Sequence, residues 1–268
     1  MRNTIFIFCL IFLFSITSVL AQNPDSNKPL KITADESLEW HRNEKYFKAK
    51  KNIRASQGQT TLLSDILTAK YREDKGKAIS IHTIQADGNV EIISPESKAY
   101  GDKAIYNIDK GYAVMTGNNL RLVSDDQNVT ARDKFKYWIN QNRLEAIGKA
   151  KAVRLGDTLE ADKIIAIFKK NKQGKQALET LEAIGNVIIT TPDEVLTGDK
   201  AIYKTTTDIA QLQGNVEITR GPNIVNGDKA QVNLKTNVSK IFGNSKQNGR
   251  VRAIFYPNSE TKPKAKSE

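Results

Sequence analysis

Hydrophobic and polar residues alternate along most of the chain. Val187 and Ile189 are separated by one residue, and so are Val216 and Ile218. A period of two places the apolar side chains of a strand on one face. The pattern therefore predicts β-strands and, beyond an apolar leader, no amphipathic helix. Lys163 to Lys172 fits a helix or a strand, and its place in the repeat described next favours a strand.

The turns between these segments form a repeat. A Gly-Asn-Val motif begins at Gly88, Gly185 and Gly214, with weaker copies at Gly117 and Gly148. Glycine and asparagine tolerate the positive φ that a strand needs at a sharp corner. A second motif, Gly-Asp-Lys-Ala or a variant of it, contains Asp102, Asp133, Asp162, Asp199 and Asp228. We expect these aspartates to bind backbone amides at the opposite corner.

A longer period lies over this repeat. Residues 101–106 recur without change as residues 198–203, an offset of 97 positions that also relates Gly88 to Gly185. Such self-similarity indicates an internal duplication of about 97 residues. The chain is predicted to be an all-β protein, a solenoid-like stack or jelly roll of antiparallel strands in two facing sheets, with open ends.

The termini predict the domain organisation and the compartment. Arg2 precedes an apolar run from Ile5 to Leu20 that ends at Ala21, as in a secretory signal peptide. We expect a signal peptide over 1–21, a linker over 22–31, the repeat domain over 32–256 and a disordered basic tail over 257–268. The mature protein would be exported. An uncleaved membrane anchor is the alternative.

Composition narrows the classes of partner. The net charge is +11, spread as single Lys and Arg residues along the chain. The positive side chains form either an ordinary solvated face or a surface for an anionic partner such as a phosphorylated lipid. Export of the protein argues against nucleic acid as its binding partner. The only cysteine, Cys9, lies in the leader, so the mature chain is expected to have no disulfide and no cysteine-bound metal.

Catalytic chemistry has little support in the sequence. The two histidines, His41 and His82, lie in different repeat units, and the aspartates recur in every unit as structural residues do. We therefore expect no enzyme and no cofactor or metal. Two rivals remain open: a β-helix enzyme that acts on polysaccharide, and a structural or adhesive exported β-solenoid.

The two motifs together resemble the LptA/OstA family. Gly185-Asn186-Val187 followed by the run 198–203 carries the resemblance, which extends over residues 32–256. It implies a twisted β-jelly-roll in the periplasm that binds the lipid A part of lipopolysaccharide and self-associates head to tail. It also implies two partners, an LptC-like inner-membrane protein and the N-terminal domain of an LptD-like outer-membrane translocon.

Two sets of residues are candidates for these roles. The alternating apolar residues would line a lipid-binding groove, or they would fill a closed core: Val90, Ile92, Tyr106, Leu120, Leu122, Phe135, Tyr137, Val187, Ile189, Tyr203, Val216, Ile218, Val232 and Leu234. The terminal segments 32–40 and 250–256 would be exposed edge strands that pair with other chains. Their candidate contact residues are Ile32, Leu38, Trp40, Val251, Ile254 and Phe255.

Overall fold

A computed structural model of the chain describes residues 28–73, 78–171, 176–233, 235–236, 238–244 and 249–256. The predicted signal peptide, residues 22–27 of the linker, Leu234 and the tail from residue 257 lie outside the described residues. Within the described part, the only helical segment is one 3-10 turn, η1 (Ile139–Gln141). The rest is strands and turns, which confirms the all-β prediction.

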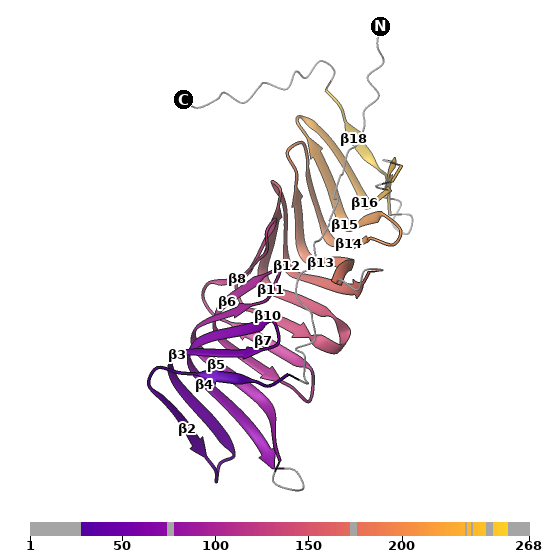
Figure 1. Cartoon of the computed structure of the whole chain (residues 1–268). Helices are drawn as coiled ribbons and strands as arrows, with labels where there is room; N and C mark the ends of the chain where they lie inside the picture. Colours follow the sequence, from indigo (N-terminus) through magenta and orange to yellow (C-terminus); the bar gives the residue numbers. More distant parts are fainter. Residues whose placement is uncertain are drawn as a thin grey trace, which may run out of the picture.

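The strands follow one another along the chain and along the molecule. The first ten are β1 (Lys31–Thr33), β2 (Ser37–His41), β3 (Tyr46–Gln57), β4 (Thr60–Glu73), β5 (Ile79–Ile93), β6 (Lys98–Asn107), β7 (Tyr112–Thr116), β8 (Leu120–Val123), β9 (Gln127–Ala131) and β10 (Lys134–Trp138). The remainder are β11 (Arg143–Arg154), β12 (Asp157–Lys170), β13 (Gln176–Thr190), β14 (Val195–Lys204), β15 (Ile209–Arg220), β16 (Asn223–Asn233), β17 (Val238–Phe242) and β18 (Arg252–Ile254). They stack as a twisted ladder from β2 at one end to β18 at the other (Figure 1).

The 97-residue period is visible in the strands themselves. β3, β4, β5 and β6 each begin and end 97 residues before β11, β12, β13 and β14. The register irregularities follow the same offset, since the shift between Leu63 and Ile66 recurs between Glu160 and Lys163. The segment between Lys163 and Lys170 is part of β12, so the strand interpretation of this stretch is confirmed.

The strands β5, β13 and β15 bend at their Gly-Asn motifs. Gly185 and Asn186 have φ values of +78° and +48°, and the pairing of β13 with β14 shifts register between Ile184 and Val187. The bend divides the ladder into two faces. Sheet I contains β2, β7, β10 and β17 with the long-strand segments that pair with them. Sheet II contains β1, β8, β9, β18 and the remaining segments.

The aspartate motif lies at the same corner as the Gly-Asn motif, not at the opposite one. Asn186 Nδ2 donates a 2.8 Å hydrogen bond to the Asp162 carboxylate on the neighbouring strand. Asn89 does the same to Asp65 at 2.8 Å. In the part of the chain that the structure describes, Asp102 follows the expected chemistry, because it accepts the backbone N–H of Asn118 at 2.8 Å. For Asp65 and Asp162 the prediction was wrong, because an asparagine side chain, and not a backbone amide, is the donor across the ladder.

Candidate functional site: an apolar groove with two open ends

The described members of the apolar set predicted from the sequence face the space between the two sheets. Nine of its members are buried in one cluster, and Ile92 and Ile189 pack against that cluster. The nine are Val90, Leu120, Leu122, Phe135, Val187, Tyr203, Val216, Ile218 and Val232. Removing each side chain of this size from water contributes roughly 1.5–3 kcal/mol to stability. Leu234 lies outside the described residues.

The tyrosines of the predicted set lie in sheet I and are less deeply buried. Burial raises the pKa of Tyr106, Tyr137 and Tyr203 above the usual value for a phenol. The Tyr137 hydroxyl is buried without a hydrogen-bond partner in the described part of the chain. Tyr106 and Tyr137 both pair with Ala113, on opposite sides of it, so small and large residues alternate along the ladder.

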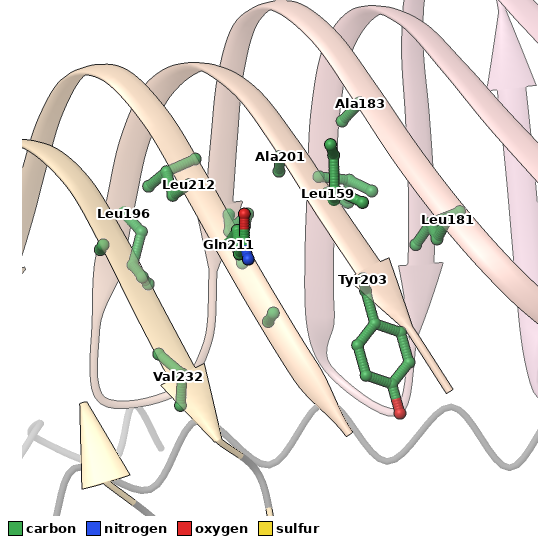
Figure 2. Close-up of a pocket in the computed structure, with 13 residues that line it drawn as sticks. Leu159, Leu181, Ala183, Leu196, Ala201, Tyr203, Gln211, Leu212 and Val232 are labelled. Atoms are coloured by element: carbon green, nitrogen blue, oxygen red, sulfur yellow. The ribbon is translucent and has the colours of Figure 1, made fainter. Parts of the chain in front are cut away.

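The interior is hollow in the second half of the molecule. The cavity measures about 550 Å³, including space that is open to solvent. Residues of both sheets line it: Leu159, Leu181, Ala183, Ile189, Leu196, Ala201, Ile202, Tyr203, Ala210, Gln211, Leu212, Ala230 and Val232. In Figure 2 the aliphatic side chains converge on this space, and the Tyr203 ring extends beyond the ribbon of β14. The enclosed part of the cavity is only about 50 Å³. Its apolar lining, rather than its volume, is typical of a ligand-binding site.

The sequence predicted only part of this lining. Ile189, Tyr203 and Val232 belong to the predicted set, whereas Leu159, Leu181, Leu196 and Leu212 do not. The missed leucines also lie at alternating positions: Leu181 and Leu212 precede the Gly-Asn-Val motifs of β13 and β15, whereas Leu159 and Leu196 lie on strands without such a motif. Alternation alone, followed through every strand, would have found them.

The N-terminal end of the ladder exposes apolar side chains. β1 and β2 cover the two segments of β3, and no other described strand pairs with their far sides. Leu38 is 59% exposed and Trp40 is 46% exposed, although both face the same way as buried Ala49. The Trp40 indole donates a 2.8 Å hydrogen bond to the Tyr71 hydroxyl. Ile32, by contrast, packs against the core.

The C-terminal end has two edge strands, of which the sequence predicted one. β18 lies on β16 in sheet II, and Val251, Ile254 and Phe255 are exposed there. β17 lies on the other segment of β16, with Phe242 also exposed. The sequence missed β17 because the segment after residue 237 has no repeat motif.

Other kinds of site find no support in the described ranges. They contain no group of three or more His, Cys, Asp or Glu side chains arranged to hold a metal ion. In the same ranges, no helix has the length and hydrophobicity needed to cross a membrane.

Comparison with known proteins decides the family. The model of a family described as "LptA/(LptD N-terminal domain) LPS transport protein" matches residues 31–143 and again residues 128–238. The chain belongs to the LptA/LptD N-terminal domain family. The two matches begin 97 residues apart, in agreement with the duplicated strands. The LptA family is described by transport of lipopolysaccharide and not by catalysis.

The comparison with solved structures found a protein that is similar to this chain, whereas the comparison with curated proteins found none. LptH from Pseudomonas aeruginosa, described as the LptA-homologous periplasmic component of the lipopolysaccharide transport device, is 18% identical. The match covers 63% of this chain and 98% of LptH, with a TM-score of 0.30. Among curated proteins, none matches the chain.

Proposed function

We propose that this protein is a periplasmic carrier of lipopolysaccharide that binds the acyl chains of lipid A between its two sheets. The observation that carries the proposal is the apolar interior, which contains a hollow, partly open to solvent, lined almost entirely by aliphatic residues. Each acyl methylene removed from water contributes about 0.8 kcal/mol, so a lipid with several chains binds tightly without many polar contacts. Membership of a lipopolysaccharide transport family supports the same ligand.

The exposed ends support a second part of the proposal, that the protein bridges membrane components. Unpaired strand edges offer backbone N–H and C=O groups to a strand of another chain. β1 and β2 at one end, and β17 and β18 at the other, provide such edges in both sheets. The partners would be an LptC-like protein, the N-terminal domain of an LptD-like translocon, or a second copy of this chain. An apolar interior shared across such joints would give lipid a continuous path.

The rival functions account for less of the geometry. A polysaccharide-acting enzyme needs paired carboxylates in a cleft, but Asp65 and Asp162 bind corner asparagines on the outside of the bend. A purely structural solenoid needs no hollow and no exposed Trp40 at its end.

Copurification tests the proposal. The mature protein is purified without detergent from a lipopolysaccharide-making host, and bound lipid is extracted and identified by mass spectrometry. We expect glycolipid in a defined molar ratio to protein. A matched variant, Ala201→Phe, fills the hollow from its sheet I wall and should carry less glycolipid. Wild-type protein that carries none would contradict the proposal.

A further inference from the structure

A row of polar residues borders the groove along the hairpin edge of sheet II. We name this row the sheet II lip. Each member lies at the end of a strand or one residue beyond it, two residues from an interior apolar residue, and therefore faces the groove. Glu194, for example, lies two residues before buried Leu196. Along the ladder the lip consists of Gln57, Thr60, Ser94, Ser97, Ser124, Gln127, Arg154, Asp157, Thr191, Glu194, Arg220 and Asn223.

The two halves of the lip occupy equivalent positions in the duplicated fold. Gln57 pairs with Thr60 across one hairpin, and Arg154 pairs with Asp157 across its duplicate. The next hairpin is also duplicated, because Ser94 N–H donates to the Ser97 carbonyl at 2.9 Å and Thr191 N–H donates to the Glu194 carbonyl at 2.9 Å.

The last positions of the lip follow from strand register. Lys98 pairs with Val123, which places Ser97 beside Ser124. Val195 pairs with Thr219, which places Glu194 beside Arg220.

Side-chain chemistry differs between the halves although the backbone does not. All six residues of the first half are neutral, whereas Arg154, Asp157, Glu194 and Arg220 in the second half are charged. The hollow lies beneath the charged half, where Leu159 and Leu196 are lip neighbours that line it.

Glu194 is the most unusual member of the charged half. Its side chain is 2% exposed, and the nearest cation is the Arg220 guanidinium at 3.5 Å. Neither carboxylate oxygen accepts a hydrogen bond from any described residue. A buried carboxylate normally accepts several hydrogen bonds, because losing water without replacement is costly. Its counterpart in the first half, Ser97, has the Ser94 hydroxyl at 2.9 Å.

We infer that the charged half of the sheet II lip, centred on Glu194 and Arg220, binds the phosphorylated sugar head group of the lipid whose acyl chains occupy the hollow. This inference rests on the proposed function. Hydroxyl or amide N–H groups of the sugar donate to Glu194, and a phosphate accepts from Arg220, which is 37% exposed. The lip residues of the first half offer no such charged contact, since the neighbouring Asp126 already pairs with Arg154 at 2.8 Å, and this half holds acyl chains alone. Each protein molecule then has one head-group site, in the second half of its fold.

The test uses two probes on the full mature protein: purified lipopolysaccharide, and the same material with its phosphates removed by phosphatase. Wild-type protein should bind the phosphorylated form about tenfold more tightly or better, as expected for a charge-assisted contact. The double variant Glu194→Ser with Arg220→Ser reproduces the first-half residues and should lose this preference while still binding the dephosphorylated form. The matched control, Ser97→Ala with Ser124→Ala, should keep it.

A reciprocal variant keeps the inference falsifiable if the first one does not fold. Ser97→Glu with Ser124→Arg gives the first half the charged pair and should raise the number of phosphorylated glycolipids bound per chain from one to two. An unchanged preference in the serine double variant, or an equal loss in the alanine control, would overturn the inference. Tighter binding of phosphatidylethanolamine than of glycolipid would also overturn it. Binding of neither glycolipid by the wild type would instead overturn the proposed function.

Discussion

Asn186 Nδ2 lies 2.8 Å from an Asp162 carboxylate oxygen across the ladder, and Asn89 lies at the same distance from Asp65, 97 residues earlier in both cases. The asparagine occupies the left-handed region and the aspartate belongs to the neighbouring strand. The two sequence motifs thus supply the donor and the acceptor of the same hydrogen bond, which recurs along the bend. This contact explains why the two motifs occur together in the units that contain Asn89, Asn186 and Asn215.

The glycine that precedes the asparagine is confined by the same aspartate. A Cβ at Gly185 would lie 2.4 Å from Asp162 Oδ2, at a φ of +78°. Gly185→Ala should therefore lower the free energy of unfolding by about 2 kcal/mol or more. Gly221→Ala is the matched control, because its φ is also positive but no atom lies within 4 Å of the added Cβ. We expect it to lose only about 1 kcal/mol.

Urea denaturation of both variants checks this prediction. Adding Asp162→Ala to Gly185→Ala should restore part of the loss, since it removes the atom that the new methyl group meets. Equal destabilisation by the two glycine substitutions would show that backbone conformation alone matters at the corner.

Two interior tyrosines differ in what their hydroxyls contact. Tyr71 is 2% exposed and accepts the Trp40 indole hydrogen bond, whereas the Tyr137 hydroxyl is buried without a partner in the described part of the chain. Tyr71→Phe should lower the free energy of unfolding by about 1 kcal/mol. Tyr137→Phe should be neutral or stabilising, because it removes an unsatisfied polar group. Thermal or urea unfolding distinguishes the two, and a larger loss for Tyr137→Phe would contradict the assignment.

Exposed apolar residues at the ends should matter for assembly more than those on the flank. Leu38→Glu puts a charge on the N-terminal edge strand, and Ile105→Glu puts one on the outer face of the middle of sheet I, where Ile105 is 38% exposed. Sedimentation velocity of the native protein should show self-association that Leu38→Glu weakens and Ile105→Glu leaves intact. A monomeric native protein, or equal effects of both changes, would count against end-to-end pairing.

Acid should loosen the N-terminal edge strand. Hydrogen bonds from Lys50 and His41 lower the pKa of Glu39 from 4.5 to about 2. Because the folded-state pKa lies below the unfolded value, the ionised carboxylate stabilises the fold above pH 4.5, and this contribution is lost as the pH falls from 4.5 towards 2. Protection of the β2 amides from hydrogen exchange, corrected for the intrinsic rate at each pH, should therefore fall over this range. Glu39→Gln and Lys50→Met should each reduce this loss of protection, and an unchanged profile in both variants would exclude Glu39 as its cause.

The fold could be predicted from the sequence because the same turn-forming motifs and the same alternation of apolar residues recur many times. Gly185-Asn186 and its copies need positive φ, so they predict corners, and the alternation of Val187 with Ile189 predicts which side faces inward. Partners across the ladder were harder to predict. The sequence does not show which strand pairs with the strand of Asp162. The Asn186 side-chain amide was therefore not predicted as the hydrogen-bond donor to the Asp162 carboxylate.

The site was less predictable than the fold for the same reason. Tyr203 and Val232 could be assigned to the interior by period, but the hollow between them depends on side-chain volumes on five strands. Glu194 looks like an ordinary turn residue in the sequence. Only the equivalence of its hairpin with that of Ser97 shows that a charge has replaced a neutral residue facing the groove.

Photo-crosslinking at two tyrosine positions tests the central claim most directly. A photoreactive residue at Tyr203 would face the groove, whereas one at Tyr100 would lie on the outer face of sheet II, where the Arg121 guanidinium is 4.2 Å from the Tyr100 ring. In cells that make lipopolysaccharide, illumination should join lipopolysaccharide to position 203 and not to position 100. Equal labelling of both positions, or labelling of neither, would contradict a lipid-binding groove between the sheets.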